Sequence, residues 1–448
     1  MADSLAAYDT LEEWIAREAV PFDIDARQTF NAAVDDMILT LGESVELLGL
    51  GEAMHGAEEI LILRNGLFAR LVEAHGYTAI AVESSFPRAH VVNEYVAGRG
   101  SPASSYAEVL AHGFSHGFGR LDANRKLVAW MRRYNADPAR ATKIRFYGFD
   151  APTEMTHTDS PRALLHFALD YLAAADRGGV DDERRLRIDN LISDDAAWEN
   201  PAAMMDPSKS IGLSPAAAAL RIETETLISD MLLRRPELAA RDDDDGRFDE
   251  ALQHAKVARQ LLNYHAGLAR ASENRIAELL GVRDVIIADN LIYMASRERS
   301  RGNSRGGRPG KVLAFGHNSH LKRGQAQWQL GPHALSWWPA GAHLSAMLGP
   351  RYAVIGSGVG TSAENGIAPP EPLTLEARLT AAAGPARFIP THLGKRFATD
   401  AVTDLPTRAG GRNPTYFPLT RQSVTDFDAL VVLDTATYHR GGPPLPGA

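Results

Sequence analysis

Seven short and mostly apolar runs, each bounded by turn residues, constrain the fold of this chain more than any other feature of its sequence. Runs without polar alternation are typical of strands that are buried on both faces of a sheet. Through residue 150 they alternate with segments of helical spacing, which predicts a mainly parallel sheet with helices on its faces. We predict strands at residues 46–50, 78–82, 143–147, 312–315, 352–356, 387–389 and 429–433.

The spacing of apolar residues also predicts where the helices lie. Three are predicted among the first strands and four more between residues 161 and 300, where few strand-like runs occur. We therefore predict an α/β fold in which residues 1–150 and 301–448 form the core. Residues 151–300 are predicted to form a helical insertion that makes part of the substrate cleft. The predicted helices are residues 57–75, 88–97, 122–135, 161–175, 182–195, 214–235 and 248–280.

The composition excludes several classes of protein. A formal net charge of -9 argues against a general nucleic-acid binder, which would carry an excess of basic residues. The chain has no cysteine, which excludes disulfides, thiolate metal sites and a cysteine nucleophile. We find neither a signal peptide nor an apolar stretch long enough to span a bilayer, so we expect a cytoplasmic protein that does not bind membranes.

Two short histidine-containing segments place proton-handling side chains where predicted strands end. Residues 51–56 follow the first strand, and residues 315–320 follow the fourth. In α/β proteins, ligands bind in the crevice at the carboxyl ends of the strands. Glu52 and His55 are three residues apart, so both can face one space, with the histidine as a general base and the carboxylate orienting it. The alternative interpretation is a helix-capping turn with a structural histidine.

Arg64 lies in the predicted helix that follows the first strand. Ile60, Leu63 and Leu67 share its face at helical spacing, so the arginine would be buried among them. An unpaired buried charge is very costly, so Arg64 needs a carboxylate partner or an anionic ligand. Glu83, at the end of the next predicted strand, is the candidate partner. The alternative is that Arg64 extends along the apolar surface to solvent.

Polar residues also follow the third and fourth predicted strands. His317, Asn318 and His320 follow the fourth. The two histidines are a base and an oxyanion donor in one interpretation, and two metal ligands in another. Asp150 follows the third strand, where it either serves the same site or caps the next turn.

Two further patterns look functional but lack the required context. Residues 113–117 match the G-x-S-x-G nucleophile elbow, yet the preceding residues predict a helix where this motif needs a strand. Residues 356–360 are glycine-rich and follow a predicted strand, but they lack the dinucleotide fingerprint and the P-loop lysine. We predict a glycine-rich loop there, either at the active site or elsewhere.

Several separate stretches, spread over most of residues 45–356, carry a family resemblance. They are Gly51-Glu52-Ala53-Met54-His55-Gly56, Ala81-Val82-Glu83, Leu127 to Asn135, Phe146 to Asp150, Arg283-Asp284 with Asn290, Gly316 to His320, and Met347-Leu348-Gly349 before Tyr352. In this order and at this spacing, they make the chain resemble the erythromycin esterase family. The resemblance implies an α/β core with a helical region around an open cleft. It also implies hydrolysis of a macrolide lactone, and thus macrolide resistance, without a covalent intermediate or an obligatory metal.

Carried over to this sequence, the resemblance implies that His55 is the general base and that Glu52, Arg64, Glu83 and His317 are the other catalytic residues. We expect His55 to activate a water that attacks the carbonyl of a small-molecule ester or lactone. Three further residues are expected to bind this substrate, namely Asn318, His320 and Asp150. No cofactor and no metal are expected.

Two alternatives remain open at this point. Glutamate and histidine side chains are also metal ligands, so a metal-dependent hydrolase of another ester or lactone is the first. The second is a non-enzymatic protein that keeps the pocket to bind a small molecule.

Overall fold

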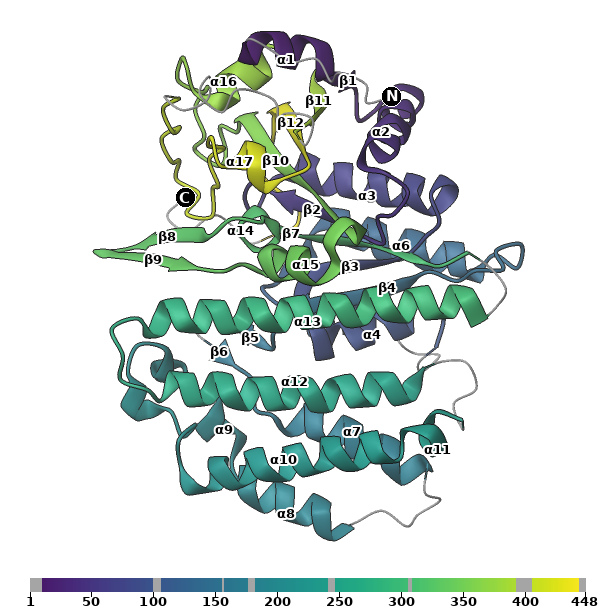
Figure 1. The fold of residues 1–448 in the computed structure, drawn as a ribbon, viewed down its shortest axis with the longest axis vertical. Coiled ribbons are helices and arrows are strands. Elements are labelled where there is room, and N and C mark those ends of the chain that lie inside the picture. Colours follow the sequence, from purple (N-terminus) through teal and green to yellow (C-terminus); the bar gives the residue numbers. More distant parts are fainter. Residues whose placement is uncertain are drawn as a thin grey trace, which may run out of the picture.

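The structure is a computed structural model that describes residues 10–99, 106–154, 157–175, 182–240, 246–304, 308–391 and 405–442. Its centre is an eight-stranded sheet with the strand order β1-β11-β12-β10-β2-β7-β3-β4 (Figure 1). From β12 to β4 every neighbouring pair is parallel. Near the other edge, β11 runs opposite to both of its neighbours, β12 and β1. The predicted α/β fold with a mainly parallel sheet and flanking helices is confirmed.

All seven predicted strands are present in this sheet. Its members are β1 (Val20–Phe22), β2 (Leu47–Glu52), β3 (Tyr77–Ser85), β4 (Arg145–Asp150), β7 (Lys311–His317), β10 (Tyr352–Thr361), β11 (Ala386–Pro390) and β12 (Ala429–Thr435). The apolar pattern missed the three-residue edge strand β1, which is too short to show periodicity. It also missed two hairpins, β5 (Thr153–Glu154) with β6 (His157–Thr158) and β8 (Ala326–Leu330) with β9 (His333–Trp337).

Residues of the central strands alternate between two apolar cores, one on each face of the sheet. In β7, Val312 and Ala314 belong to one core, and Leu313 and Phe315 belong to the other. Because both faces are dry, every position of such a strand must be apolar or small. This is the physical reason for the uninterrupted apolar runs in the sequence.

Helices cover both faces. The first face carries α2 (Arg27–Leu41), α3 (Glu58–Ala74) and α6 (Asp122–Ala136), while α4 (Phe86–Val96) packs against β3 and β4. The other face carries α13 (Arg275–Ser304) and α15 (Ala340–Leu348). Shorter helices complete the chain: α1 (Leu11–Glu18), α5 (Tyr106–His112), α14 (Asn318–Leu321), α16 (Leu375–Thr380) and α17 (Ser423–Asp426).

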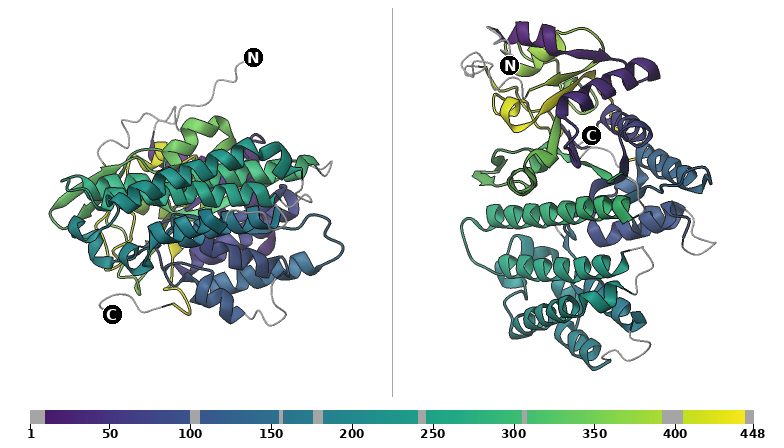
Figure 2. Two further views of the ribbon diagram at one scale, coloured as in Figure 1. Left: turned by 90° about the horizontal axis from the view of Figure 1, so that it is seen from below. Right: turned by 45° about the vertical axis from the view of Figure 1, so that its right-hand side comes forward.

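The segment between β6 and β7 contains only helices and turns in its described residues. Beyond α13, the helices α12 (Arg247–Leu268), α10 (Pro215–Leu233) and α8 (Asp182–Ile192) stack in successive layers away from the sheet (Figures 1 and 2). The segment also holds α7 (Arg162–Ala175), α9 (Asp195–Trp198) and α11 (Arg235–Ala239). No helix of the described ranges is both long and apolar enough to cross a bilayer. The division into residues 1–150, 151–300 and 301–448 stays a prediction, and α13 packs directly on β4 and β7.

The helix predicted at residues 248–280 is wrong, because the structure has two helices there. The first ends at Leu268 and the second begins at Arg275, and the two pack against each other. Between them, the N–H of Arg275 donates to the carbonyl of Ser272 and the N–H of Asn274 donates to its hydroxyl. Apolar spacing continues across this short polar turn, so the periodic pattern alone did not reveal the reversal.

The glycine-rich loop predicted at residues 356–360 is also wrong, since these residues belong to β10 and pair with β12. The glycines are required by close packing. A Cβ on Gly356 would lie 2.6 Å from the ring of Phe427, and one on Gly358 would lie 2.6 Å from Leu419. The side chains of Phe427 and Leu419 pack directly against the strand backbone, in space that any side chain larger than glycine would fill.

Candidate active site

The carboxyl ends of four neighbouring strands meet at one edge of the sheet, in the order β2, β7, β3, β4. Glu52 ends β2 and pairs in register with His317, which ends β7. Glu83 lies near the end of β3, and Asp150 ends β4. Parallel pairing therefore brings together side chains that lie far apart in the sequence.

His55 is held by Glu52 in the turn between β2 and α3. Its Nδ1 lies 2.5 Å from Oε1 of Glu52. The backbone of His55 is fixed by a distant segment, because its N–H donates to Oγ1 of Thr415 and its carbonyl accepts from Nδ2 of Asn413. The side chain keeps 28% of its exposure, and no residue in the described ranges bonds its Nε2. This nitrogen is therefore the one that a water or a ligand would contact.

The charges around His55 determine its protonation state. Burial by itself lowers the pKa of this imidazole, but the charge of Glu52, its hydrogen bond and the charge of Glu83 together raise the pKa to about 9. His55 is consequently an imidazolium at neutral pH, paired with the carboxylate of Glu52. It becomes a base only when it loses this proton.

A cavity of about 20 Å³ lies beside His55, which is room for about one water molecule. Four of the five predicted catalytic residues line it, from β2, the turn after it, α3 and β3, whereas His317 does not. Aromatic and aliphatic side chains form most of the rest of its wall. The polar lining is Glu52, His55, Arg64, Glu83 and Asn124, and the apolar lining includes Leu61, Val82, Phe114, Phe118, Leu121 and Phe315.

Arg64 lines this cavity as a buried cation. Its side chain is 1% exposed, so the alternative that it extends to solvent is wrong. Nε and Nη2 donate to Oδ1 of Asn65, at 3.1 and 2.7 Å, and the guanidinium lies 4.8 Å from the ring centre of Phe315. Burial lowers the pKa of Arg64 to about 10, which still leaves it charged at neutral pH. A buried arginine held by an amide rather than a carboxylate is suited to an anion that forms in the cavity.

The predicted ion pair between Arg64 and Glu83 is not the one that forms. Glu83 pairs instead with Arg283 of α13, whose Nη2 lies 3.1 Å from Oε1 of Glu83. The other carboxylate oxygen accepts from the backbone N–H of His317, at 2.7 Å. Burial raises the pKa of Glu83, but the charges of His320, His55 and Arg283 hold it well below its ordinary value. Glu83 is therefore a fixed, ionised carboxylate.

His317 lies beside His55, with their ring centres 5.1 Å apart, but both of its nitrogens are engaged. Its Nε2 is 2.7 Å from the carbonyl of Thr415, so this nitrogen carries the hydrogen. Its Nδ1 accepts from the hydroxyl and the N–H of Ser319, at 2.6 and 3.2 Å. Burial and the charge of His55 lower the pKa of His317 to about 3, so the ring is neutral.

The residues predicted to bind substrate lie close to the site but are buried. Asn318 is fully buried, and its side-chain amide exchanges two hydrogen bonds with the backbone of Ser357 on β10, at 2.8 and 3.1 Å. Asp150 is also fully buried and binds Nε and Nη2 of Arg283, at 2.8 and 2.7 Å. His320 is 6% exposed. All three support the residues around the cavity and do not line it.

His320 joins two acidic groups. Its Nδ1 lies 2.7 Å from Oδ1 of Asp284, whose other oxygen accepts from Nε1 of Trp337. Its Nε2 lies 3.5 Å from Oε1 of Glu83. Burial lowers the pKa of His320, but the charge of Asp284 raises it overall. The imidazole therefore couples Asp284 to the carboxylate beside His55.

Arg283, Asp284 and Thr415 also belong to the site, although the sequence did not predict them as its residues. Arg283 and Asp284 were noticed only as part of the family resemblance. A signal did exist, since the two charged residues stand next to each other among the apolar residues Val282 and Val285-Ile286-Ile287. Thr415 had no signal, because its segment has no regular structure and only the tertiary fold brings it to His55.

The Ser115 motif is not a nucleophile elbow. It follows helix α5, the side chain of Ser115 is 1% exposed, and its hydroxyl accepts from the N–H of Ser85 at 3.0 Å. Within the described ranges, one group of acidic and histidine side chains has the spacing of metal ligands. It consists of Glu52, His55 and Glu83, whose ligand atoms all lie within 4.8 Å of one another.

Comparisons with known proteins agree with this architecture. The model of a family described as erythromycin esterase matches residues 72–436, a stretch that includes Glu83 and His317 and begins after Arg64. Erythromycin esterase type II of Escherichia coli is 22% identical over 351 residues, which are 77% of this chain and 76% of that protein.

Three solved structures have a similar fold. A Bacillus cereus protein has a TM-score of 0.69 at 18% identity, covering 96% of this chain and 98% of its own. A protein described as a succinoglycan biosynthesis protein has a TM-score of 0.67 at 18% identity, with the same coverage. A mutant of the erythromycin esterase EreC in its open conformation has a TM-score of 0.60 at 18% identity, covering 90% of this chain and 93% of its own.

Proposed function

The chain belongs to the erythromycin esterase family, whose members are esterases, and from this membership we propose that it opens a macrolide lactone by attack of a water activated by His55. One observation supports this most directly. Glu52 holds one nitrogen of His55, while the other nitrogen has no bonded partner among the described residues, and the imidazole lines a cavity with room for about one water. An organism that makes such an enzyme would resist macrolide antibiotics.

In the proposed reaction, His55 in its neutral form takes a proton from the water as the water attacks the ester carbonyl. Proton transfer of this kind contributes about 10²–10⁴-fold to the rate. Glu52 keeps the ring in place and balances the imidazolium that forms. The imidazolium then gives its proton to the leaving alkoxide, and the products are a carboxylic acid and an alcohol.

Arg64 is the proposed stabiliser of the oxyanion. It is the buried cation of the cavity, and its hydrogen bonds go to Asn65 rather than to a carboxylate. Charge that develops on the carbonyl oxygen would meet a positive group already in place, and no water has to reorganise. His317 is less suited to this role, because its only N–H donates to Thr415.

The size of the cavity constrains how a macrolide would bind. Room for about one water excludes the macrocycle. We therefore propose that the macrocycle lies outside the cavity, against a cleft whose wall comes partly from residues 151–300. The ion pair between Arg283, which belongs to residues 151–300, and Glu83 supports this proposal, because it brings that segment next to the cavity.

A metal-dependent esterase is the second candidate, because Glu52, His55 and Glu83 have the spacing of three ligands. Two features argue against it. Arg64 lines the same cavity and would repel a cation, and Nδ1 of His55 already binds Glu52. We expect the purified protein to keep its full activity after dialysis against a chelator, and loss that zinc or manganese restores would favour the metal enzyme.

The direct test is incubation of the purified protein with a panel of macrolides, followed by mass spectrometry. We expect a gain of one water for at least one lactone. His55→Ala should abolish this gain and leave thermal unfolding unchanged, and the exposed histidine variant His333→Ala should behave as the wild type. Retained macrolide without any mass change would favour the binding protein, and near wild-type turnover by His55→Ala would contradict the proposed base.

A further inference from the structure

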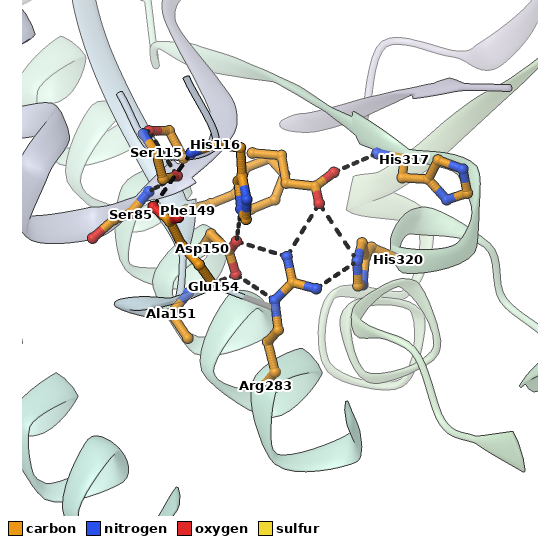
Figure 3. A network of polar contacts seen from close by, with 12 residues as sticks. Ser85, Ser115, His116, Phe149, Asp150, Ala151, Glu154, Arg283, His317 and His320 are labelled. Carbon is orange, nitrogen blue, oxygen red and sulfur yellow. Dashed lines mark hydrogen bonds and ion pairs between the residues drawn. The ribbon is translucent and has the colours of Figure 1, made fainter. Parts of the chain in front are cut away.

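Arg283 contacts three groups around the candidate active site (Figure 3). Its Nη2 lies 3.1 Å from Oε1 of Glu83 and 2.7 Å from Oδ2 of Asp150, and its Nε lies 2.8 Å from Oδ1 of Asp150. Its Nη1 lies 3.2 Å from Nε2 of His320. The partners come from β3, β4 and α14, whereas Arg283 comes from α13 of the helical segment.

We propose that Arg283 is a positioning residue of the active site, whose guanidinium fixes the carboxylate of Glu83 beside His55 and ties the helical segment to the reaction centre. The inference rests on the proposed function, in which His55 is the base.

The planar shape of arginine matters here, not only its charge. Glu83 is 5% exposed and Asp150 is fully buried, so each carboxylate needs hydrogen bonds from the protein to stay ionised. The guanidinium binds Asp150 through two nitrogens and reaches Glu83 with one of them at the same time. We call these simultaneous contacts of Nε and Nη2 the fork of Arg283. A lysine ammonium is a point charge and cannot reproduce this fork.

Arg283 also determines how Glu83 acts on His55. One oxygen of Glu83 is held by Arg283 and the other by the N–H of His317. A carboxylate held at both oxygens is poorly placed to accept a proton from water. Glu83 therefore acts through its charge, which favours the protonated form of His55, whereas the charge of Arg283 opposes it.

Charged and titratable groups from every surrounding element contribute to this balance. Those around Arg283 and His55 are Glu52, Arg64, Glu83, His116, Asp150, Tyr264, Asp284, His317, His320 and His439. Only Arg283 among them binds both Glu83 and Asp150 in the described ranges.

Two substitutions separate the fork from the charge. Arg283→Lys keeps the charge and loses the fork, while Arg283→Gln loses both. Arg297 provides matched controls, since it lies on the same helix and its guanidinium pairs with the half-buried carboxylate of Glu250, away from the cavity. The corresponding variants are Arg297→Lys and Arg297→Gln. Thermal unfolding of each variant checks that it folds.

The first measurement needs no substrate. The titration of His55 is followed by NMR of protein with labelled histidine, and the His55 signal is assigned by its loss in His55→Ala. Arg283→Gln should move the midpoint to higher pH, because a positive charge beside the imidazolium is removed, while both Arg297 variants should leave it within experimental error. An unchanged midpoint in Arg283→Gln would overturn the proposal.

The second measurement is turnover of a lactone that the wild type hydrolyses. Arg283→Lys should lose roughly 10²-fold in kcat with little change in KM, as expected when a catalytic group is misplaced by about 1 Å. A kcat within twofold of the wild type would show that the fork positions nothing. If neither Arg283 variant folds, Asp150→Asn is measured instead, because it removes the carboxylate that binds Nε and Nη2 of Arg283. The kcat of this variant should fall. A kcat equal to that of the wild type would overturn the proposal. Absence of turnover in the wild type itself would count against the proposed function, and the NMR titration would still decide the role of Arg283.

Discussion

The ring centres of His55 and His317 lie 5.1 Å apart, yet the pKa values of the two rings are shifted in opposite directions from the ordinary value of histidine. The pKa of His55 is raised to about 9, chiefly by Glu52 against the effect of burial, and that of His317 is lowered to about 3 by burial and the charge of His55. Two neighbouring groups whose environments separate their pKa values in this way have different chemical roles. His55 is the one that gains and loses a proton near pH 9, whereas His317 stays neutral and holds the segment around Thr415.

This separation predicts the pH profile of hydrolysis. Because the base form of His55 appears only as its proton leaves, kcat/KM should rise about tenfold per pH unit below the pKa of about 9 and level off above it. Initial rates across pH 6 to 10, corrected for spontaneous ester hydrolysis with His55→Ala, would measure this. A profile that is flat from pH 7 to 9 would show that His55 is not the base.

Glu52→Gln should move this profile. The charge and the hydrogen bond of Glu52 raise the pKa of His55, so their loss should lower that pKa and shift the rising part of the profile to lower pH. The plateau should fall as well, because an amide no longer balances the imidazolium. Glu59→Gln is the matched control, since this glutamate is in the same region but binds Thr437. An unshifted profile in Glu52→Gln would contradict the assigned pairing.

Arg64→Met should reduce kcat by about 10²–10³-fold with little change in KM, which is the cost of losing one good oxyanion donor. Methionine keeps much of the side-chain volume against Phe315 but carries no charge. Arg132→Met is the control, because Arg132 also lies over an aromatic ring, that of Tyr95, but does not line the cavity. Equal losses in both variants would indicate a general effect on packing and not on the transition state.

Gly356→Ala should destabilise the fold. The added methyl would lie 2.6 Å from the ring of Phe427, and overpacking of this kind costs about 1–3 kcal/mol. Chemical denaturation of the variant and the wild type would measure the difference. Gly410→Ala, at a position with no neighbouring atom within 4 Å, should change the free energy of unfolding much less. Equal stability of both variants would show that β10 and its neighbours adapt to the methyl.

Much of the architecture could be predicted because its causes are local. A strand that is buried on both faces has an uninterrupted apolar run in its sequence. All seven strands predicted from such runs are present in the structure. Glu52 and His55 were predicted as a pair from their spacing alone, and they lie 2.5 Å apart. The predictions failed where local pattern and tertiary packing differ, as in the turn between α12 and α13 and in the glycines that accommodate Phe427.

The partners of the charged residues depended on the three-dimensional arrangement. The sequence could predict that Arg64 needs a partner. It could not predict that the carboxylate of Glu83 binds Arg283, which lies 200 residues further along the chain. The sequence by itself therefore determined which side chains stand at the strand ends, since strand identity and helical spacing are short-range properties. Only the tertiary structure decided which of them meet, which proton each one holds and which face the cavity, because desolvation and Coulomb interactions depend on distances in space rather than along the chain.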